Sequence, residues 1–245
     1  LAPSKKALCS LAAFPDPVSI REWKKDHPGG VVVSYINTYL PVKAESDYCT
    51  TSGNAPQVLR HVAKKYPGDP ILFLPDAYLG FYAAKLLEAE GESIDRLWLL
   101  AGACHVHDMI RPYHVEIARR DHPDAAVVVH PECGCASACM RRDDTATAKE
   151  VFRFRSTQGM IDFVRNAKEK EIIVATEVGN LYPMGKAAPG KTLIPANGDA
   201  VCAFMKQNTL KSVYLSLRDL RHVVTVDPDL ARRAREPIER MLAIG

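Results

Sequence analysis

The sequence predicts an α/β protein built from repeated units, whose short parallel sheets surround a shared centre. The first observation is the spacing of three cysteines: Cys9 lies 95 positions before Cys104 (104 − 9), and Cys202 lies 98 positions after it (202 − 104). The second observation is that apolar runs of strand length alternate with helix-like segments. We therefore interpret the chain as copies of one unit, each of which brings a cysteine to the same centre.

The sequence between these cysteines repeats as well. Matching pairs of segments, with their offsets, are 26–33 with 121–129 (95), Tyr35-Ile-Asn37 with His130-Pro-Glu132 (95), Thr51-Ser52 with Ser156-Thr157 (105), and Pro75-Asp76 with Thr176-Glu177 (101). The offset changes because a segment around 134–143 has no counterpart in the earlier copy. Since the order of the matching segments is kept, we take the repeat as real.

The repeat divides the chain into four segments. If each unit ends in its cysteine, residues 1–13 are the tail of a first unit whose body is absent. Residues 14–107 then form a second αβα unit, and residues 108–204 form a third. Residues 205–245 do not follow the repeat, and we expect them to pack against the first unit.

Strands and helices can be assigned in order. For the second unit the expected elements are a helix from Pro17 to Lys24, a strand 31–35, a helix capped by Ser52, a strand 71–74, a helix 79–90 and a strand 97–100. For the rest they are helices 111–120 and 160–168, strands 126–130, 172–175 and near 193–194, a helix from Met205, a strand 223–226, and a helix from Asp227-Pro228 that is kinked or restarted at Pro237. Continuous apolar strands are typical of parallel sheets covered on both faces.

Composition excludes several classes of function. The 245 residues carry a net charge of +3, and no basic tract is long enough to follow a phosphate backbone, so we expect no nucleic-acid partner. Apolar runs are far shorter than the roughly 20 residues that span a membrane. No secretory pattern precedes Cys9. We expect a cytoplasmic protein, or a plastid one in a plant or alga, and we interpret its seven cysteines as ligands or reactive thiols.

Side chains that follow the strands are the candidates for chemistry, because the carboxyl ends of parallel strands line the binding crevice. These residues are Tyr35, Asn37, Asp76, Cys104, His107, His130, Glu132, Glu177 and Cys202. His130 and Glu132 lie on either side of Pro131, so both can face the crevice as an acid/base pair, although a strand-end histidine is often structural. The Thr51-Ser52 and Ser156-Thr157 pairs either cap helices or bind an anion; their recurrence in two units favours the anion.

Three widely spaced cysteines suit an iron–sulfur cluster or a zinc site. Structural zinc sites usually contain local C-x2-C pairs, and none surrounds Cys9, Cys104 or Cys202. Three thiolates on a [4Fe–4S] cluster leave one iron open as a Lewis acid. A second group consists of Cys133, Cys135 and Cys139, for which a metal site, a regulatory disulfide and an exposed loop of ordinary thiols stay open. Cys49 is interpreted as a packing residue.

The chain resembles the quinolinate synthase family over essentially its whole length. Runs that carry the resemblance include Ser34-Tyr-Ile-Asn-Thr38, Asp47-Tyr-Cys-Thr-Thr-Ser-Gly-Asn54, Gly102-Ala-Cys-His-Val-His107, His130-Pro-Glu-Cys133, Thr176-Glu-Val-Gly179 and Cys202-x2-Met205-x2-Asn208-Thr-Leu210. Each run alone is weak evidence, whereas their common order is specific. The resemblance implies a transferase of NAD biosynthesis that condenses iminoaspartate with dihydroxyacetone phosphate, with L-aspartate oxidase as the supplier of iminoaspartate.

The resemblance also implies three pseudo-symmetric three-layer αβα units around a central [4Fe–4S] cluster. Its implied ligands are Cys9, Cys104 and Cys202; its catalytic residues are Tyr35, His107, His130 and Glu132; and its substrate-binding residues are Asn37, Thr51, Ser52, Ser156 and Thr157. Two departures stand out: Arg155 replaces the family's usual glycine before the Ser-Thr pair, and the first unit, which supplies a histidine and a tyrosine, is absent. We therefore expect this chain alone to hold neither cluster nor activity.

Two rival functions stay open. One is another iron–sulfur hydro-lyase on the same scaffold, which substrate trials would distinguish. The other is a non-catalytic metal-binding protein that uses Cys133, Cys135 and Cys139.

Overall fold

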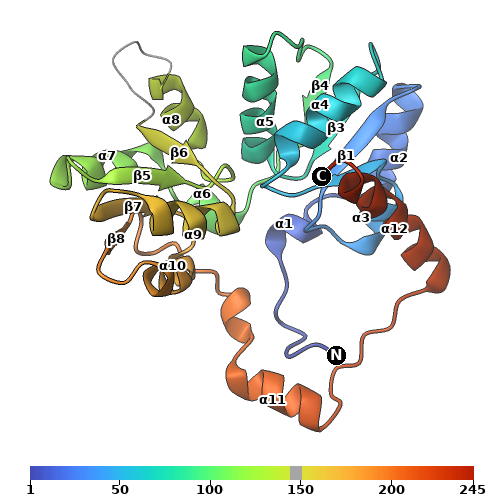
Figure 1. Ribbon diagram of the computed structural model, residues 1–245. Helices are drawn as coiled ribbons and strands as arrows, with labels where there is room; N and C mark the ends of the chain where they lie inside the picture. The colour runs from blue at the N-terminus through green and yellow to red at the C-terminus, as the bar shows by residue number, and fades with distance from the viewer. Residues whose placement is uncertain (144–150) are drawn as a thin grey trace.

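The computed structural model, which describes residues 1–143 and 151–245, contains two parallel sheets of four strands each (Figure 1). Strands of the first sheet are β1 (Val31–Tyr35), β2 (Tyr48–Thr50), β3 (Ile71–Leu74) and β4 (Leu97–Leu99), in the order β2-β1-β3-β4. Strands of the second are β5 (Ala126–Val129), β6 (Phe152–Phe154), β7 (Glu171–Ala175) and β8 (Thr192–Pro195), in the order β6-β5-β7-β8. The two sheets therefore have the same strand topology, as expected for a repeated α/β unit.

Strand register reproduces the offsets read from the sequence. Val31 pairs with Ile71 in the first sheet, and Ala126 pairs with Ile172 in the second, which gives offsets of 95 (126 − 31) and 101 (172 − 71). β2 and β6 are likewise shifted by 105 positions, because Tyr48 pairs with Val33 and Arg153 pairs with Val128. The drift in offset therefore arises from the connections between strands and not from the sheets.

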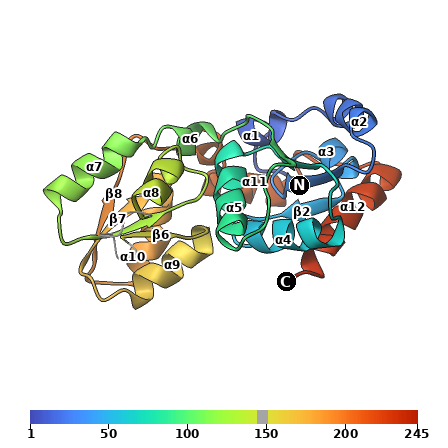
Figure 2. The same ribbon diagram turned by 90° about the horizontal axis from the view of Figure 1, so that it is seen from above.

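Helices cover both faces of each sheet. Those of the second unit are α2 (Pro17–Asp26), α3 (Leu40–Ala44), α4 (Ala55–Lys65) and α5 (Ala77–Ala89). Those of the third unit are α7 (Pro112–Asp121), α8 (Ala136–Asp143), α9 (Thr157–Asn166), the 3-10 turn η1 (Val178–Asn180) and α10 (Leu181–Ala187). Val33 faces the core under α4 and α5 while Val32 faces α2 and α3; Val127 faces α7 and α8 while Val128 faces α9 and α10. Each unit thus has three layers, and Figure 2 shows the units side by side.

Shorter elements follow the three spaced cysteines, and two further helices end the chain. They are α1 (Ser10–Ala13), α6 (His105–Asp108), η2 (Met205–Gln207), α11 (Leu210–Arg218) and α12 (Pro228–Leu242). α12 packs on α3 and β2 of the second unit: Met241 enters that unit's core, and Arg240 donates to the carbonyl of Asp47 at 2.9 Å. α12 therefore packs on the second unit, and our expectation that residues 205–245 pack against the first unit stays a prediction.

α11 lies apart from both sheets, next to the start of the chain (Figure 1). The hydroxyl of Ser216 donates to the carbonyl of Ala2 at 3.0 Å, and the N–H of Ala2 donates to the carbonyl of His222 at 3.0 Å. These contacts join the two end segments of the chain.

Several predicted elements need correction. Residues 223–226 form no strand, because Val223 and Val224 are exposed and no described strand pairs with them. α12 continues through Pro237, which is buried, so the predicted restart is wrong, and the alternative of a kink stays a prediction. The helix expected to be capped by Ser52 begins at Ala55 with Asn54 as its N-cap. The elements that we did not predict are the strands β2 and β6 and the helices α1, α3, α6, α8 and α10, all of eight residues or fewer.

None of the described helices is both long enough and apolar enough to cross a membrane.

Candidate functional site

Three of the four predicted catalytic side chains meet between the two units. His130 and Glu132 follow β5, and His107 comes from α6, whose Val106 packs in the core on the same side of that sheet. The Nδ1 atom of His107 lies 3.8 Å from Oε2 of Glu132, and Nδ1 of His130 lies 4.0 Å from Oε1. The two imidazole rings are 4.6 Å apart at an angle of 72°. All three side chains are buried, so the structure brings a two-histidine, one-carboxylate group into a protected place.

Tyr35, the fourth predicted catalytic residue, ends β1 and lies beside this group. Burial is the main reason that the pKa of its phenol is raised, and the Glu132 carboxylate raises it further, while the hydroxyl of Ser52 acts in the opposite direction. The phenol therefore lies between the buried carboxyl of one unit and a predicted substrate-binding serine of the other. Tyr35 is protonated at neutral pH and can donate a hydrogen bond.

Burial also determines the charges of the site. It raises the pKa of Glu132, with a further increase from the Asp76 carboxylate, and it is the largest reason that the pKa of Asp76 itself is raised. It lowers the pKa of His107 to about 4, with a smaller contribution from His105, and it lowers that of His130 well below its usual range. At neutral pH both imidazoles are uncharged, and the buried carboxyls hold protons far more readily than exposed ones.

Two polar atoms of the group lack partners. In the part of the chain that the structure describes, neither Nδ1 of His107 nor Oε1 of Glu132 has a hydrogen-bond partner. A buried polar atom without a partner costs about 1–3 kcal/mol, and functional sites are where such atoms are kept. The two atoms indicate a place for a ligand.

The three spaced cysteines occupy equivalent turns. The N–H of Ala12 donates to Sγ of Cys9 at 3.4 Å, and the N–H of Met205 donates to Sγ of Cys202 at 3.5 Å. Burial raises the pKa of Cys104 to about 11, against which the backbone N–H groups of His107 and Val106 act. In each turn an amide three residues along the chain points at the sulfur, as expected for a repeat.

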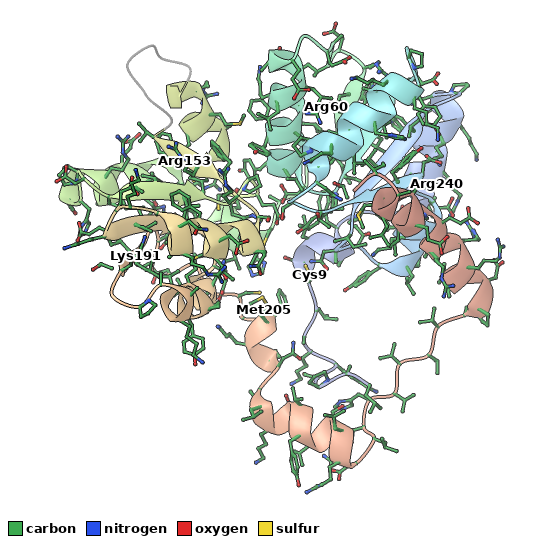
Figure 3. The ribbon with its side chains drawn as sticks, viewed as in Figure 1. Cys9, Arg60, Arg153, Lys191, Met205 and Arg240 are labelled. Atoms are coloured by element: carbon green, nitrogen blue, oxygen red, sulfur yellow. The ribbon has the colours of Figure 1, made fainter. Side chains whose placement is uncertain are left out.

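Neighbouring side chains bring these turns together. The hydroxyl of Ser10 lies 2.8 Å from Nδ1 of His105, and the His105 ring meets the Phe204 ring at a centroid distance of 5.4 Å. Asn37, a predicted substrate-binding residue, donates from Nδ2 to Sγ of Cys9 at 3.2 Å. Figure 3 shows Cys9 between the two units and Met205 on the segment that leads to α11. Three sulfurs from three turns, each approached by amide N–H groups, fit the ligand set of a [4Fe–4S] cluster.

Two carboxylates anchor the cysteine turns, and their roles were not predicted from the sequence. Oδ2 of Asp76 accepts from the N–H of Cys104 at 3.4 Å, and Oε1 of Glu177 accepts from the N–H of Cys202 at 3.2 Å. Asp76 and Glu177 are matching residues of the repeat, each placed after the third strand of its unit. Their matching positions were the signal that could have revealed this role.

The predicted anion-binding hydroxyls are only partly brought together. Ser52 and Ser156 line one cavity of about 330 Å³ between the units, together with Pro131 and Arg155. Ser156 also caps α9 by accepting from the N–H of Gly159 at 3.4 Å. The other two hydroxyl residues, Thr51 and Thr157, do not line this cavity. Thr51 instead donates to the side chain of Asn54 at 2.9 Å.

The second cysteine group is buried, so our interpretation of an exposed loop is wrong. Cys133, Cys135 and Cys139 belong to the third unit's core beneath α7 and α8, and the thiol of Cys133 donates to the carbonyl of Ala175 at 3.2 Å. None of the seven cysteines, all of which lie in the described residues, forms a disulfide. Nor do the three sulfurs lie within 4.8 Å of one another as a set. The rival function as a metal-binding protein at these cysteines finds no support.

The chain is similar to known proteins over its whole length. A family model described as quinolinate synthetase A protein matches residues 1–243. The chain is 43% identical to a quinolinate synthase of Thermus thermophilus, over all of this chain and 74% of that protein. It is 42% identical to one from Pyrobaculum aerophilum, over 98% of this chain and 75% of the relative. It is 40% identical to one from a Mycobacterium species, over all of this chain and 71% of the relative.

Proposed function

The chain belongs to the quinolinate synthase family of NAD biosynthesis, and on this premise we propose that it condenses iminoaspartate with dihydroxyacetone phosphate, giving quinolinate, phosphate and water. The observation that carries the proposal is the convergence of three cysteine turns with a buried pair of neutral imidazoles and a protonated carboxyl. The first group is suited to a cluster and the second to proton transfer.

Cys9, Cys104 and Cys202 would hold the [4Fe–4S] cluster. When bound, the cluster supplies an open iron that acts as a Lewis acid on a substrate oxygen. Asp76 and Glu177 hold two of the three cysteine turns in place through backbone N–H groups.

The remaining chemistry needs proton transfer, because condensation removes protons from carbon and the departure of water requires a proton on oxygen. His107 and His130 are uncharged and can accept protons. Glu132 keeps its proton through burial and can donate it, with the Tyr35 phenol beside it as a second donor. Together these residues supply both directions of proton transfer.

Both substrates are anionic, and they need groups that hold carboxylate and phosphate. We assign this role to Asn37, Thr51, Ser52, Ser156 and Thr157. The cavity that joins Ser52 and Ser156 supports the assignment for these two. We further propose a cytoplasmic enzyme to which L-aspartate oxidase delivers iminoaspartate, since an imine hydrolyses in water.

The test is iron and acid-labile sulfide per chain, measured on the complete polypeptide prepared without oxygen, with quinolinate formation measured on the same sample. We expect about four irons in the parent, almost none in Cys104→Ala, and quinolinate only from the parent. Zinc in both proteins, or a loaded cluster without quinolinate, would contradict the proposal. The 245-residue chain alone should hold neither cluster nor activity; turnover by it would show that no further unit is needed.

A further inference from the structure

The two imidazoles and the carboxylate of the candidate site have the composition of a metal site in their own right. Within the described residues, His107, His130 and Glu132 form the one group of three or more possible ligands whose ligand atoms all lie within 4.8 Å of one another. We propose that this triad binds a divalent transition-metal ion of the Zn²⁺ class, at the place where substrate is processed, and that the bound ion blocks turnover.

The distances suit such an ion. The N···O separations are 3.8 Å from Nδ1 of His107 to Oε2 of Glu132 and 4.0 Å from Nδ1 of His130 to Oε1. Zinc holds imidazole nitrogen and carboxylate oxygen at roughly 2.0–2.2 Å, which places neighbouring ligand atoms roughly 3–3.5 Å apart. Side-chain shifts of less than about 1 Å therefore close the site around an ion.

The hydrogen-bond partners of the three ligand side chains also support a metal site. Nδ1 of His107 and Oε1 of Glu132 are buried without a described hydrogen-bond partner, and a metal ion would satisfy both. Nδ1 of His130 has only a long contact, 3.5 Å, with the backbone N–H of Glu132. Among the described residues, no Lys or Arg side chain forms an ion pair with this carboxylate, whose close contacts are the two histidines and Tyr35. A metal ion at this place would therefore replace the carboxyl proton of Glu132 and would meet no competing lysine or arginine.

The ligand types select the ion. Two imidazoles and one carboxylate with open positions are typical of sites for Fe²⁺, Co²⁺ and Zn²⁺, whereas Mg²⁺ and Ca²⁺ prefer oxygen ligands alone. Val106, the neighbour of His107 in α6, packs in the same core as β5, the strand that His130 and Glu132 follow. An ion bound here would therefore fix α6 to this strand end and occupy the space beside the proton-transfer groups.

Co²⁺ is the probe of choice, because the chain also contains seven cysteines. Thiolate ligands give Co²⁺ an intense sulfur-to-metal absorption band that nitrogen and oxygen ligands do not. We expect the first equivalent of Co²⁺ added to the metal-free complete polypeptide to show ligand-field bands without the sulfur band, and Zn²⁺ to displace it. A sulfur band at the first equivalent would overturn the proposal.

Two variants and one control sharpen this experiment. His130→Gln and Glu132→Gln should each weaken Co²⁺ binding by at least roughly tenfold, since even changes outside the ligand set cost about 10–100-fold. His122→Gln alters a histidine at the protein surface and should bind Co²⁺ as the parent does. Glu132→Gln keeps the shape of its side chain, so it serves if His130→Gln does not fold. Unchanged Co²⁺ affinity in either folded variant would refute the proposal.

Blocking of turnover rests on the proposed function, whereas Co²⁺ binding does not. Zn²⁺ added to the cluster-loaded enzyme should stop quinolinate formation while iron and sulfide content stay constant, and a chelator should restore it. Binding without inhibition would refute the blocking role. Binding by a loaded protein that never forms quinolinate would instead count against the proposed function.

Discussion

The second and third units share a scaffold and differ in what their strand ends carry. Both sheets have the same strand order, and both hold a cysteine turn through a carboxylate that follows the third strand. At the end of the first matching strand, however, one unit has Tyr35 and Asn37, and the other has His130 and Glu132. The two copies are alike at the carboxylates that hold the cysteine turns, and they differ at the strand ends to which we assign proton transfer.

The largest expected effect is on iron binding, and it distinguishes the three spaced cysteines from the second group, Cys133, Cys135 and Cys139. Cys202→Ala should abolish iron binding because it removes one of three ligands, whereas Cys139→Ala removes a buried thiol with no place in the ligand set. Iron and sulfide analysis of both variants in the complete polypeptide checks this. Equal iron content in the two variants would show that Cys9, Cys104 and Cys202 do not act together as the cluster ligands.

The next effect concerns the differing strand ends. Glu132→Gln should lower kcat by roughly 10²–10⁴-fold, because the amide cannot donate the proton that burial keeps on the carboxyl. Steady-state quinolinate formation checks the prediction, and Glu171→Gln, at a half-exposed residue that begins β7, is the control. An unchanged kcat in Glu132→Gln would show that proton transfer does not depend on the Glu132 carboxyl, and that this difference between the strand ends has no catalytic role.

The same residue should give a pH effect on stability. Burial raises the pKa of Glu132 above the ordinary 4.5, so the folded state binds this proton more tightly than the unfolded state does. The stabilisation is complete below pH 4.5 and is lost as pH rises through the raised pKa. In urea unfolding of the cluster-free protein, the parent should lose roughly 3 kcal/mol more than Glu132→Gln between about pH 5 and pH 9. If the free energy of unfolding changes with pH by the same amount in the parent and in Glu132→Gln, the Glu132 carboxyl is ionised in the folded protein. Asp76, whose pKa burial also raises, contributes equally to the pH dependence of both proteins.

The smallest effect compares the two anchors. Asp76 is fully buried and also caps α5 by accepting from the N–H of Leu79 at 2.8 Å, so Asp76→Ala should cost about 1–3 kcal/mol. Glu177 lies nearer the surface, with Lys206 3.7 Å away, and Glu177→Ala should cost about 1 kcal/mol. Urea unfolding at neutral pH checks the order. A reversed order would show that the Cys202 turn depends more on its carboxylate than the Cys104 turn does.

Sequence reasoning succeeded where buried apolar runs are continuous. The strands around Val31–Tyr35 and Glu171–Ala175 were expected because both of their faces are covered. It failed at β2 and β6, three-residue edge strands without a long apolar run. The segment 223–226 has the right residue types and no strand to pair with among the described residues.

In the candidate site, too, features set by the local sequence could be predicted, and features set by tertiary packing could not. His130 and Glu132 could be predicted because they alternate directly after a strand, which fixes the side to which they point. Their approach to His107 depends on how α6 packs into the core beside β5, and no local pattern encodes that. Ser52 was misassigned as a cap because Asn54 lies closer to the first turn of α4. Cys133 is buried because residues of α7 and α8 pack in the same core, and this packing could not be read from its local sequence.

α6 has a further consequence, because one helical turn carries both Cys104 at its cap and His107 within it. If Cys104 is a cluster ligand and His107 a proton-transfer group, as we propose, the two roles share one short piece of backbone. A change that displaces one end of this turn would then displace the other, so a substitution aimed at the cluster could also alter proton transfer.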